Sequence, residues 1–211
     1  MRASGNGSTS TTVPTRMSTL MNASKGVMRN RLLFAPMALP ERTTGGPTIW
    51  SVGYAADEAP GFLRRLAAHG IVQIADIRTN AWSRYQTDFR RGTIERLFSD
   101  AGVAYRFFGE GLGGKPDDEE RLTDGRPDDG KILDDPRFEA ELTALIQWAQ
   151  EAPTAFMCGC GWPQGCHRGR LLTPALEARG LLVRHITPDG RVADSLAGAE
   201  LLRTGQASLF D

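Results

Sequence analysis

The chain has 211 residues, of which 40% are hydrophobic and 24% are charged, and its formal net charge is zero. This composition predicts a soluble globular protein with one domain of ordinary size. It excludes a membrane-spanning segment, because no run of about 18 apolar residues occurs, and it argues against a strongly basic groove for nucleic-acid phosphates.

The first 46 residues differ from the rest in composition. They include the small polar run SGNGSTSTTVPT and show no apolar periodicity. We therefore predict a disordered tail, or an over-called start, for residues 1–46. Residues 47–190 are predicted to form an α/β domain, and residues 191–211 a C-terminal segment and tail.

From Thr48 onward, short apolar runs alternate with helical patterns. The first half of this region predicts a strand at 48–54, a helix at 60–70, a strand at 71–78, a helix from Thr93 to Gly102 and a strand at 103–108. Thr93 is the predicted N-cap of its helix, since threonine side chains accept hydrogen bonds from the first turn.

A long segment rich in Gly, Asp and Pro follows, from Gly109 to Asp135, and predicts a functional or mobile loop. After it come a helix opened by Asp135 and Pro136, a strand at 154–159, a helix at 167–180 kinked at Pro174, and a strand at 181–187.

Alternation of strands with helices predicts a single α/β domain with a mostly parallel five-stranded sheet and helices on both faces. In such sheets, ligands bind beyond the carboxyl ends of the strands. Asp76, Arg78, Cys158 and Cys160 all lie at predicted strand ends. The pattern therefore gathers them at one edge of the sheet.

All three cysteines of the chain fall in the run FMCGCGWPQGCHRGRL, as Cys158, Cys160 and Cys166, with His167 and Arg168 directly after them. An odd number of cysteines in one local cluster does not suit a secreted disulfide framework. It predicts cytoplasmic thiols or ligands.

Four segments carry a family resemblance: TIWSVGY, IADIRTNAWSR, YRFFGEGLGG and CGCGWPQGCHR. In order and spacing they resemble the family called domain of unknown function 488, over about Thr48 to Thr187. The resemblance implies an α/β fold and supplies no established reaction. At position 160 the family pattern usually has glutamate, whereas this chain has Cys160.

One interpretation of the cluster is nucleophilic. Cys166 is predicted to lie at the start of a helix, where partial positive charge favours a thiolate. The candidate catalytic residues are Cys166, Cys158, His167 and Asp76. Because neighbouring side chains on a helix do not face each other, His167 is expected to face Cys158 or a ligand. The enzyme would be cysteine-dependent and act on a nucleotide, DNA or another phosphate-bearing substrate.

A second interpretation is a metal site. Three thiolates and one imidazole, from Cys158, Cys160, Cys166 and His167, suit zinc or an iron–sulfur centre in ligand type. The spacing C-x-C-x5-C-H is not the usual paired C-x2-C, and the family's glutamate at position 160 weakens this alternative.

The third interpretation, which the sequence favours, is an anion-binding pocket without a resident cofactor. Arg78, Arg84, Arg168 and Ser83 are the candidate anion-binding residues, since convergent arginines beside a helix start suit a phosphate or carboxylate.

The chain ends in GQASLFD. Residues 206–210 resemble the pentapeptide Q-x-[SD]-L-F that binds the bacterial sliding clamp, with Gln206, Leu209 and Phe210 as the contact residues. A clamp partner would bring the protein to DNA and would fit a cytoplasmic role in DNA repair. The sequence therefore leaves three hypotheses: a nucleotide- or DNA-associated enzyme, a metalloprotein and a non-catalytic clamp-docking module.

Overall fold

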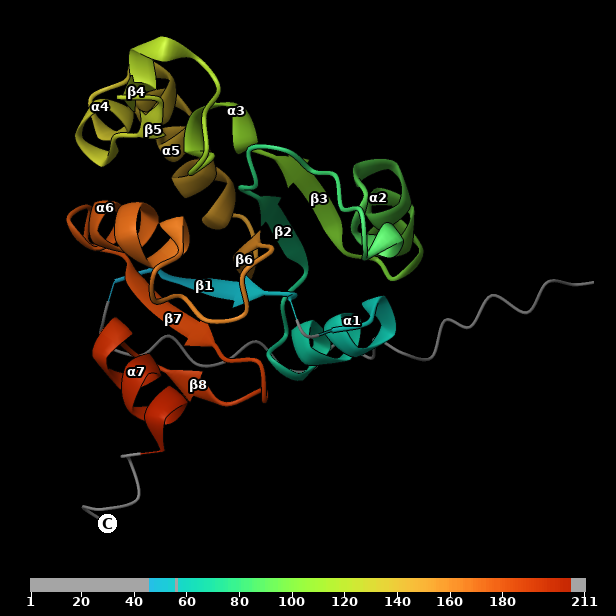
Figure 1. Cartoon of the computed structure of the whole chain (residues 1–211). Helices are drawn as coiled ribbons and strands as arrows, with labels where there is room; N and C mark the ends of the chain where they lie inside the picture. Colours follow the sequence, from blue (N-terminus) through green and yellow to red (C-terminus); the bar gives the residue numbers. More distant parts are fainter. Residues whose placement is uncertain (1–45, 56, 206–211) are drawn as a thin grey trace, which may run out of the picture. The chain divides into compact units, whose positions relative to one another are not determined.

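A computed structural model describes residues 46–55 and 57–205 of the chain. These residues form a six-stranded sheet in the order β3-β2-β6-β1-β7-β8 and a separate two-stranded sheet, β4-β5 (Figure 1). Of the predicted N-terminal segment, residues 1–46, all but Gly46 lie outside the described residues.

The prediction of a mostly parallel α/β sheet is confirmed. Five strands run parallel: β1 (Thr48–Gly53), β2 (Gln73–Asp76), β3 (Ala104–Phe107), β6 (Thr154–Cys158) and β7 (Leu182–Ile186). They are the five strands that the sequence predicts. The sixth strand, β8 (Val192–Ala193), pairs antiparallel with β7 and has two residues, too few to produce a hydrophobic period.

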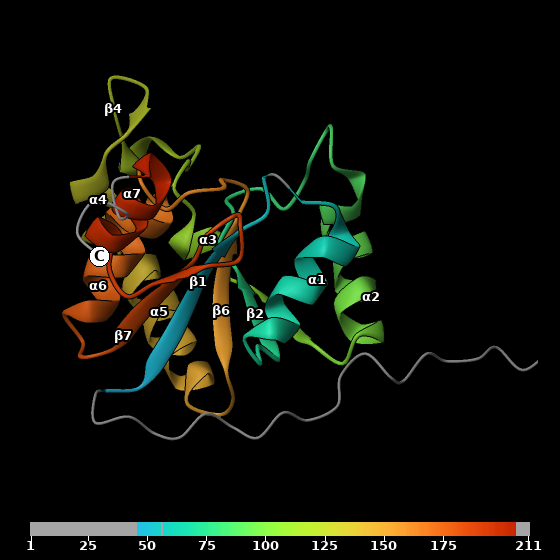
Figure 2. The same ribbon diagram turned by 90° about the horizontal axis from the view of Figure 1, so that it is seen from below.

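Helices cover both faces of the sheet, as predicted (Figure 2). On one side lie α1 (Ala59–Ala68) and α2 (Arg91–Asp100), and on the other α5 (Pro136–Ala149) and α6 (Thr173–Glu177). The last helix of the described residues, α7 (Leu196–Thr204), follows β8. No helix in the described part of the chain is long and apolar enough to cross a membrane.

Each central strand contributes to two hydrophobic cores because its side chains alternate between faces. On β1, Ile49 lies in the core under α5 and α6, whereas Val52 lies in the core under α1 and α2. β7 repeats this division with Val183 and Ile186. Burial on both faces explains why β6, whose five residues TAFMC are all buried, reads as a nearly continuous apolar run.

The predicted loop from Gly109 to Asp135 contains secondary structure, and in this respect the prediction was wrong. It holds α3 (Gly109–Leu112), the 3-10 helix η2 (Glu119–Arg121), β4 (Leu122–Thr123), β5 (Arg126–Pro127) and α4 (Asp129–Leu133). These short elements have no repeating apolar pattern that the sequence could reveal. Instead, polar side chains cap them: the Asp128 side chain accepts hydrogen bonds from the backbone N–H groups of Gly130 and Lys131 at the start of α4.

The helix starts were predicted with mixed success. Asp135 caps α5 through a hydrogen bond from the Arg137 N–H, as expected. Thr93 is not the cap of α2, which begins at Arg91 after an extended Arg90. There the Arg91 N–H donates to the Ala81 carbonyl at 2.8 Å, so a tertiary contact sets the start of the helix.

The predicted helix 167–180 is divided into two parts. Residues Arg168–Leu172 form a π-helix, η3, and α6 follows from Thr173. Pro174 has no N–H to donate to the preceding turn. The Thr173 N–H donates to the Arg168 carbonyl five residues earlier, which is the wide hydrogen bond of a π-helix.

Candidate metal centre

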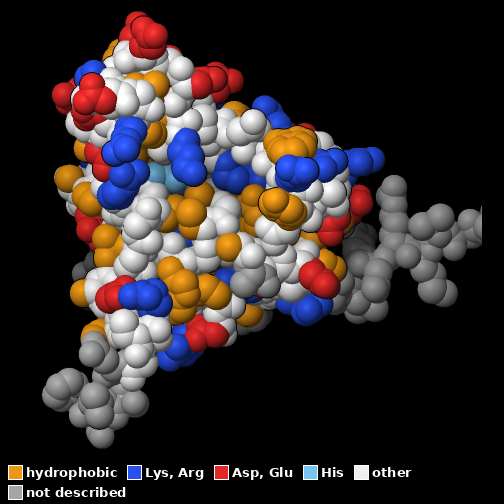
Figure 3. All heavy atoms as spheres, viewed as in Figure 1, with side chains coloured by type: hydrophobic (Ala, Val, Ile, Leu, Met, Phe, Trp, Pro, Cys, Tyr) orange, Lys and Arg blue, Asp and Glu red, His pale blue; other side chains and the backbone are white. Residues whose placement is uncertain are grey.

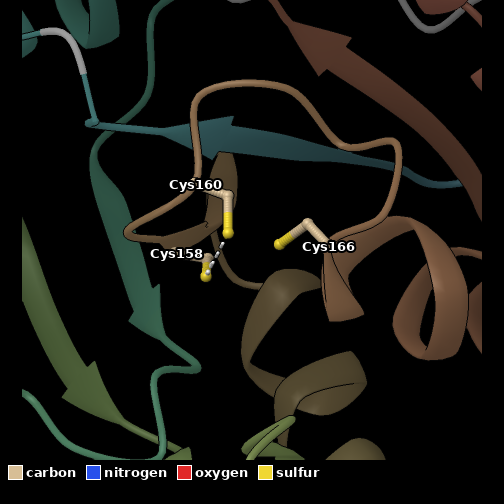
Figure 4. A group of neighbouring side chains, drawn as sticks. All are labelled: Cys158, Cys160 and Cys166. Atoms are coloured by element: carbon tan, nitrogen blue, oxygen red, sulfur yellow. Dashed lines mark hydrogen bonds between the residues drawn. The ribbon is translucent and has the colours of Figure 1, made fainter.

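The three cysteines meet at the carboxyl end of β6. Cys158 is the last residue of β6, Cys160 follows in the next loop, and Cys166 lies directly before η3. Their Sγ atoms all lie within 4.8 Å of one another, and those of Cys158 and Cys160 are 3.9 Å apart. Figure 4 shows the three thiols pointing into the same space. Cys158 and Cys166 are buried, whereas Cys160 is exposed.

His167 completes the group with one ring nitrogen. Its Nδ1 lies 3.7 Å from the Sγ of Cys158 and 3.8 Å from that of Cys166. Its Nε2 lies 2.9 Å from the Ile77 carbonyl oxygen. A carbonyl oxygen only accepts, so Nε2 is the donor in this contact, and in the neutral ring Nδ1 then has the lone pair that faces the sulfurs. His167 thus faces Cys158, as the sequence suggests, but it also faces its neighbour Cys166, which the sequence argument did not expect.

Three of the six separations among these four ligand atoms are close to the edges of a tetrahedral coordination sphere, and the other two sulfur–sulfur separations lie within 4.8 Å. With zinc–sulfur bonds of about 2.3 Å and zinc–nitrogen bonds of about 2.0 Å, two sulfurs lie about 3.8 Å apart and a sulfur and a nitrogen about 3.5 Å apart. The separation of 3.9 Å between the sulfurs of Cys158 and Cys160, and those of 3.7 and 3.8 Å from His167 Nδ1, differ from these values by a few tenths of an ångström.

Two glycines allow the backbone to approach the group closely. A Cβ atom at Gly114 would lie 2.3 Å from Cβ of His167, and one at Gly53 would lie 1.6 Å from the Cys160 carbonyl oxygen. Contacts under about 3 Å are not tolerated by real Cβ atoms, so both positions require glycine. Gly114 belongs to the Leu-Gly-Gly stretch, which therefore supports the ring of His167.

The pKa values of the thiols are shifted in opposite directions. Hydrogen bonds from Cys158 and Cys160 lower the pKa of Cys166, and His167 and Arg168 lower it further against the effect of burial. Hydrogen bonds with Cys158 and Cys166, together with burial, raise the pKa of Cys160. The cluster therefore favours a thiolate at Cys166, a property that suits a nucleophile and a metal ligand equally.

Arg168 fixes the loop that carries Cys160. The side chain is fully buried, and its Nη2 donates to the carbonyl oxygens of Cys160 at 2.9 Å and Gly161 at 3.0 Å. Its Nη1 donates to the Ser51 hydroxyl on β1 at 3.0 Å. His185 on β7 is buried and lies beside Ser51 in the sheet register. Burial, and then the positive charge of Arg168, lowers the pKa of His185 to about 4. In this structure Arg168 therefore binds two backbone carbonyls and one hydroxyl, and its side chain is not exposed to solvent.

Asp76 and Arg78 form a buried ion pair with their own set of partners. The Arg78 Nε and Nη2 donate to the two Asp76 carboxylate oxygens at 2.8 and 2.6 Å. Arg78 Nη1 donates to the Tyr54 hydroxyl and to the Phe89 carbonyl, both at 2.8 Å. The Tyr105 hydroxyl donates to Asp76 at 2.8 Å, and burial followed by the Asp76 charge raises the pKa of Tyr105.

The remaining predicted anion-binding residues lie in the loop after β2. The Ser83 hydroxyl accepts a hydrogen bond from the Gln86 N–H at 3.0 Å and so stabilises a turn. Arg84 is exposed, and its guanidinium lies 6.0 Å from the centre of the Tyr85 ring. Of the three candidate arginines, Arg84 is the one whose donors face solvent. Gln206, Leu209 and Phe210 lie outside the described residues.

Two groups that stabilise the carboxyl edge of the sheet were not predicted from the sequence. The Ile77 carbonyl, which orients His167, carries no side-chain signal. Arg65 donates to the carbonyls of Gly53 at 2.6 Å and Thr187 at 2.8 Å and pairs with Asp57. The sequence could have indicated this role, because Arg65 lies among the apolar residues that form the buried face of α1. A buried arginine needs hydrogen-bond partners inside the protein.

Comparisons with known proteins give one match. Residues 59–173 match the family described as Domain of unknown function DUF488. Neither the curated proteins nor the solved structures include a match to this chain. The matched residues run from the start of α1 to the start of α6 and include the three cysteines, His167 and the Asp76–Arg78 pair. Because the match spans more than half of the sequence, the chain belongs to the DUF488 family.

Proposed function

We propose that this protein binds zinc through Cys158, Cys160, Cys166 and His167. The observation that supports this best is the position of His167, whose Nδ1 faces two sulfurs while its Nε2 is held by the Ile77 carbonyl. A metal-binding histidine typically donates its second ring N–H to such a partner, which fixes both the tautomer and the ring orientation.

The donor set supports one zinc ion rather than an iron–sulfur cluster. Sulfur atoms within 4.8 Å of one another suit ligands of one ion, whereas clusters are usually held by four cysteines divided between their irons. Four protein ligands fill a tetrahedron and leave no position for a reactive water, which is typical of a structural zinc site. Burial of Cys158 and Cys166 also favours ligands over nucleophiles, which need access to substrate.

Metal analysis of the reduced full-length protein tests this proposal. We expect about one zinc per chain, as in structural sites with four protein ligands. Replacement of zinc by cobalt should give the visible absorption of a metal ion in tetrahedral thiolate coordination. The purified protein should show no visible absorption from an iron–sulfur cluster.

A triple variant with Cys158, Cys160 and Cys166 replaced by serine is the reference for this measurement. If the reduced wild-type protein binds zinc no more tightly than this variant, the proposed zinc site is excluded. Visible absorption with equal amounts of iron and sulfide would instead favour the cluster.

A second proposal concerns the partner that the sequence suggests. We infer that Gln206, Leu209 and Phe210 bind a bacterial sliding clamp, which would place the protein in DNA repair. The supporting observation is position: α7 ends at Thr204, and Gly205 in the left-handed region with φ 74° separates the helix from the pentapeptide.

Capture of the full-length chain on an immobilised bacterial clamp tests this inference. Phe210→Ala and Leu209→Ala are expected to abolish capture, because the side chains of Leu209 and Phe210 would fill an apolar pocket of the clamp. Ala207→Ser changes the unspecified position of the motif and should be captured like the wild type. Equal capture of all three variants would show that the motif does not bind the clamp.

A further inference from the structure

Two large aromatic side chains are exposed in the loop between β2 and α2. Trp82 is 57% exposed and Tyr85 is 89% exposed, the highest fractions among the large hydrophobic residues that the structure describes. Neither residue belongs to the metal centre. Exposed aromatic rings of this size commonly mark a surface that binds another molecule.

The loop holds these rings in a fixed framework. The Gln86 side chain donates to the Asp57 carbonyl at 3.0 Å, and Arg90 Nε donates to the Ser83 carbonyl at 2.9 Å. At the base of the loop, Phe89 is buried and its ring stacks on that of Tyr54, with centroids 3.9 Å apart. The rings of Trp82 and Tyr85 are therefore presented by a loop that is anchored at several points.

An arginine accompanies each exposed ring. The guanidinium of Arg90 lies 5.1 Å from the centre of the Trp82 ring, and that of Arg84 lies 6.0 Å from the centre of the Tyr85 ring. Within the described residues, neither arginine pairs with a carboxylate. On the face seen in Figure 3, Lys and Arg side chains lie around exposed hydrophobic side chains over the part of the molecule that holds α2.

Rings and unpaired guanidinium groups together suit one kind of ligand. Single-stranded nucleic acids bind where bases stack on aromatic rings and phosphates meet positive charge. A duplex keeps its bases stacked on each other and offers no free base faces to this surface. We propose that the loop carrying Trp82, Arg84, Tyr85 and Arg90 binds a single-stranded nucleic acid, with bases on the rings and phosphates on the arginines.

Negative charges nearby limit the path of the strand. Asp57, Glu58 and Asp88 line a hollow beside Tyr85. Asp57 pairs with Arg65, but Glu58 and Asp88 would repel phosphate, so we expect the phosphates to lie next to Arg84 and Arg90 rather than in this hollow. The zero net charge of the chain is consistent with such a short, local site.

Fluorescence anisotropy with full-length protein and labelled oligonucleotides tests the proposal. Probes of about 16 nucleotides, the upper end of common single-strand site sizes, are oligothymidylate, oligouridylate and a duplex of equal length. We expect both single strands to bind more tightly than the duplex at low salt. The two single-stranded probes show whether DNA or RNA binds better.

Variants of the exposed residues separate stacking from charge. Trp82→Ala and Tyr85→Ala are each expected to weaken binding about tenfold, a typical loss for one stacked base. Tyr85→Phe keeps the ring and should bind like the wild type. Arg84→Ala should lower the slope of log affinity against log salt by about 0.7, as expected for one lost phosphate contact. Asp88→Asn should tighten binding.

Matched controls are available on other surfaces. Arg126→Ala removes an exposed arginine on β5, and Leu201→Ala removes an exposed apolar side chain on α7. Both should bind like the wild type. Duplex binding as tight as single-strand binding, or unchanged affinity of the Trp82→Ala and Tyr85→Ala variants with intact circular dichroism, would overturn the proposal.

Discussion

Cys166→Ser is expected to abolish the stabilisation of the fold by zinc. For the wild type, free zinc at about 1,000 times the dissociation constant should raise the free energy of unfolding by about 4 kcal/mol. Cys166 supplies a buried thiolate that a serine hydroxyl does not replace, because soft thiolate ligands select zinc. Chemical denaturation with and without zinc measures the difference for each protein.

Taking the difference with and without zinc removes any direct effect of the substitution on folding. The histidines give a matched pair: His167→Asn should lose most of the zinc effect, whereas His69→Asn, at the end of α1, should keep it. A Cys166→Ser protein with the full zinc effect would show that Cys166 is not a ligand.

The glycine that supports His167 gives a finer check on the same expectation. Gly114→Ala places a Cβ against the histidine ring, whereas Gly92→Ala on α2 meets no atom within 4 Å. Zinc affinity should therefore fall by about tenfold or more in Gly114→Ala, as when a partner that orients a ligand is lost. It should not change in Gly92→Ala.

Asp76→Ala is expected to lower the free energy of unfolding by about 3–5 kcal/mol, because it leaves the buried guanidinium of Arg78 without its counter-ion. Asp76 is fully buried, Arg78 is 6% exposed, and the Tyr105 hydroxyl also loses its acceptor. Urea denaturation followed by circular dichroism measures the loss.

Two further variants identify the cause of that loss. Asp76→Ala combined with Arg78→Met removes both charges and should recover part of the stability, since an apolar pair leaves no buried charge unpaired. Glu95→Ala breaks the exposed pair with Arg91 and should change stability little. Equal losses in the single and double variants would show that the pair itself, rather than the unpaired charge, contributes the stability.

The centre of the sheet was predictable because β2 and β6 are buried at every position, on both faces. Such strands appear in the sequence as apolar runs such as TAFMCG, whatever their neighbours are. The elements between Gly109 and Asp135 were not predictable in this way. They depend on capping and ion pairs, such as that of Arg121 with Asp118, which leave no periodic signal.

The site was predictable where its residues are close in sequence and unpredictable where they are not. Cys158, Cys166 and His167 come together because a short turn joins a strand to a helix. The partners of Arg78 come from Tyr54 and Phe89, which are 24 and 11 positions away, so the sequence did not show that its donors are occupied. The direction of Arg168 likewise depends on Ser51, 117 positions away.

The contacts of Arg168 have a consequence for how the proposed metal centre would acquire an ion. Arg168 holds the carbonyls of Cys160 and Gly161 against β1 with hydrogen bonds that involve no metal. The ligand loop is therefore preorganised, and little chain entropy remains to be lost when the ion enters. In a zinc finger, by contrast, the metal is required for folding. This protein would exchange its ion as a folded molecule, with exposed Cys160 as the point of entry and release.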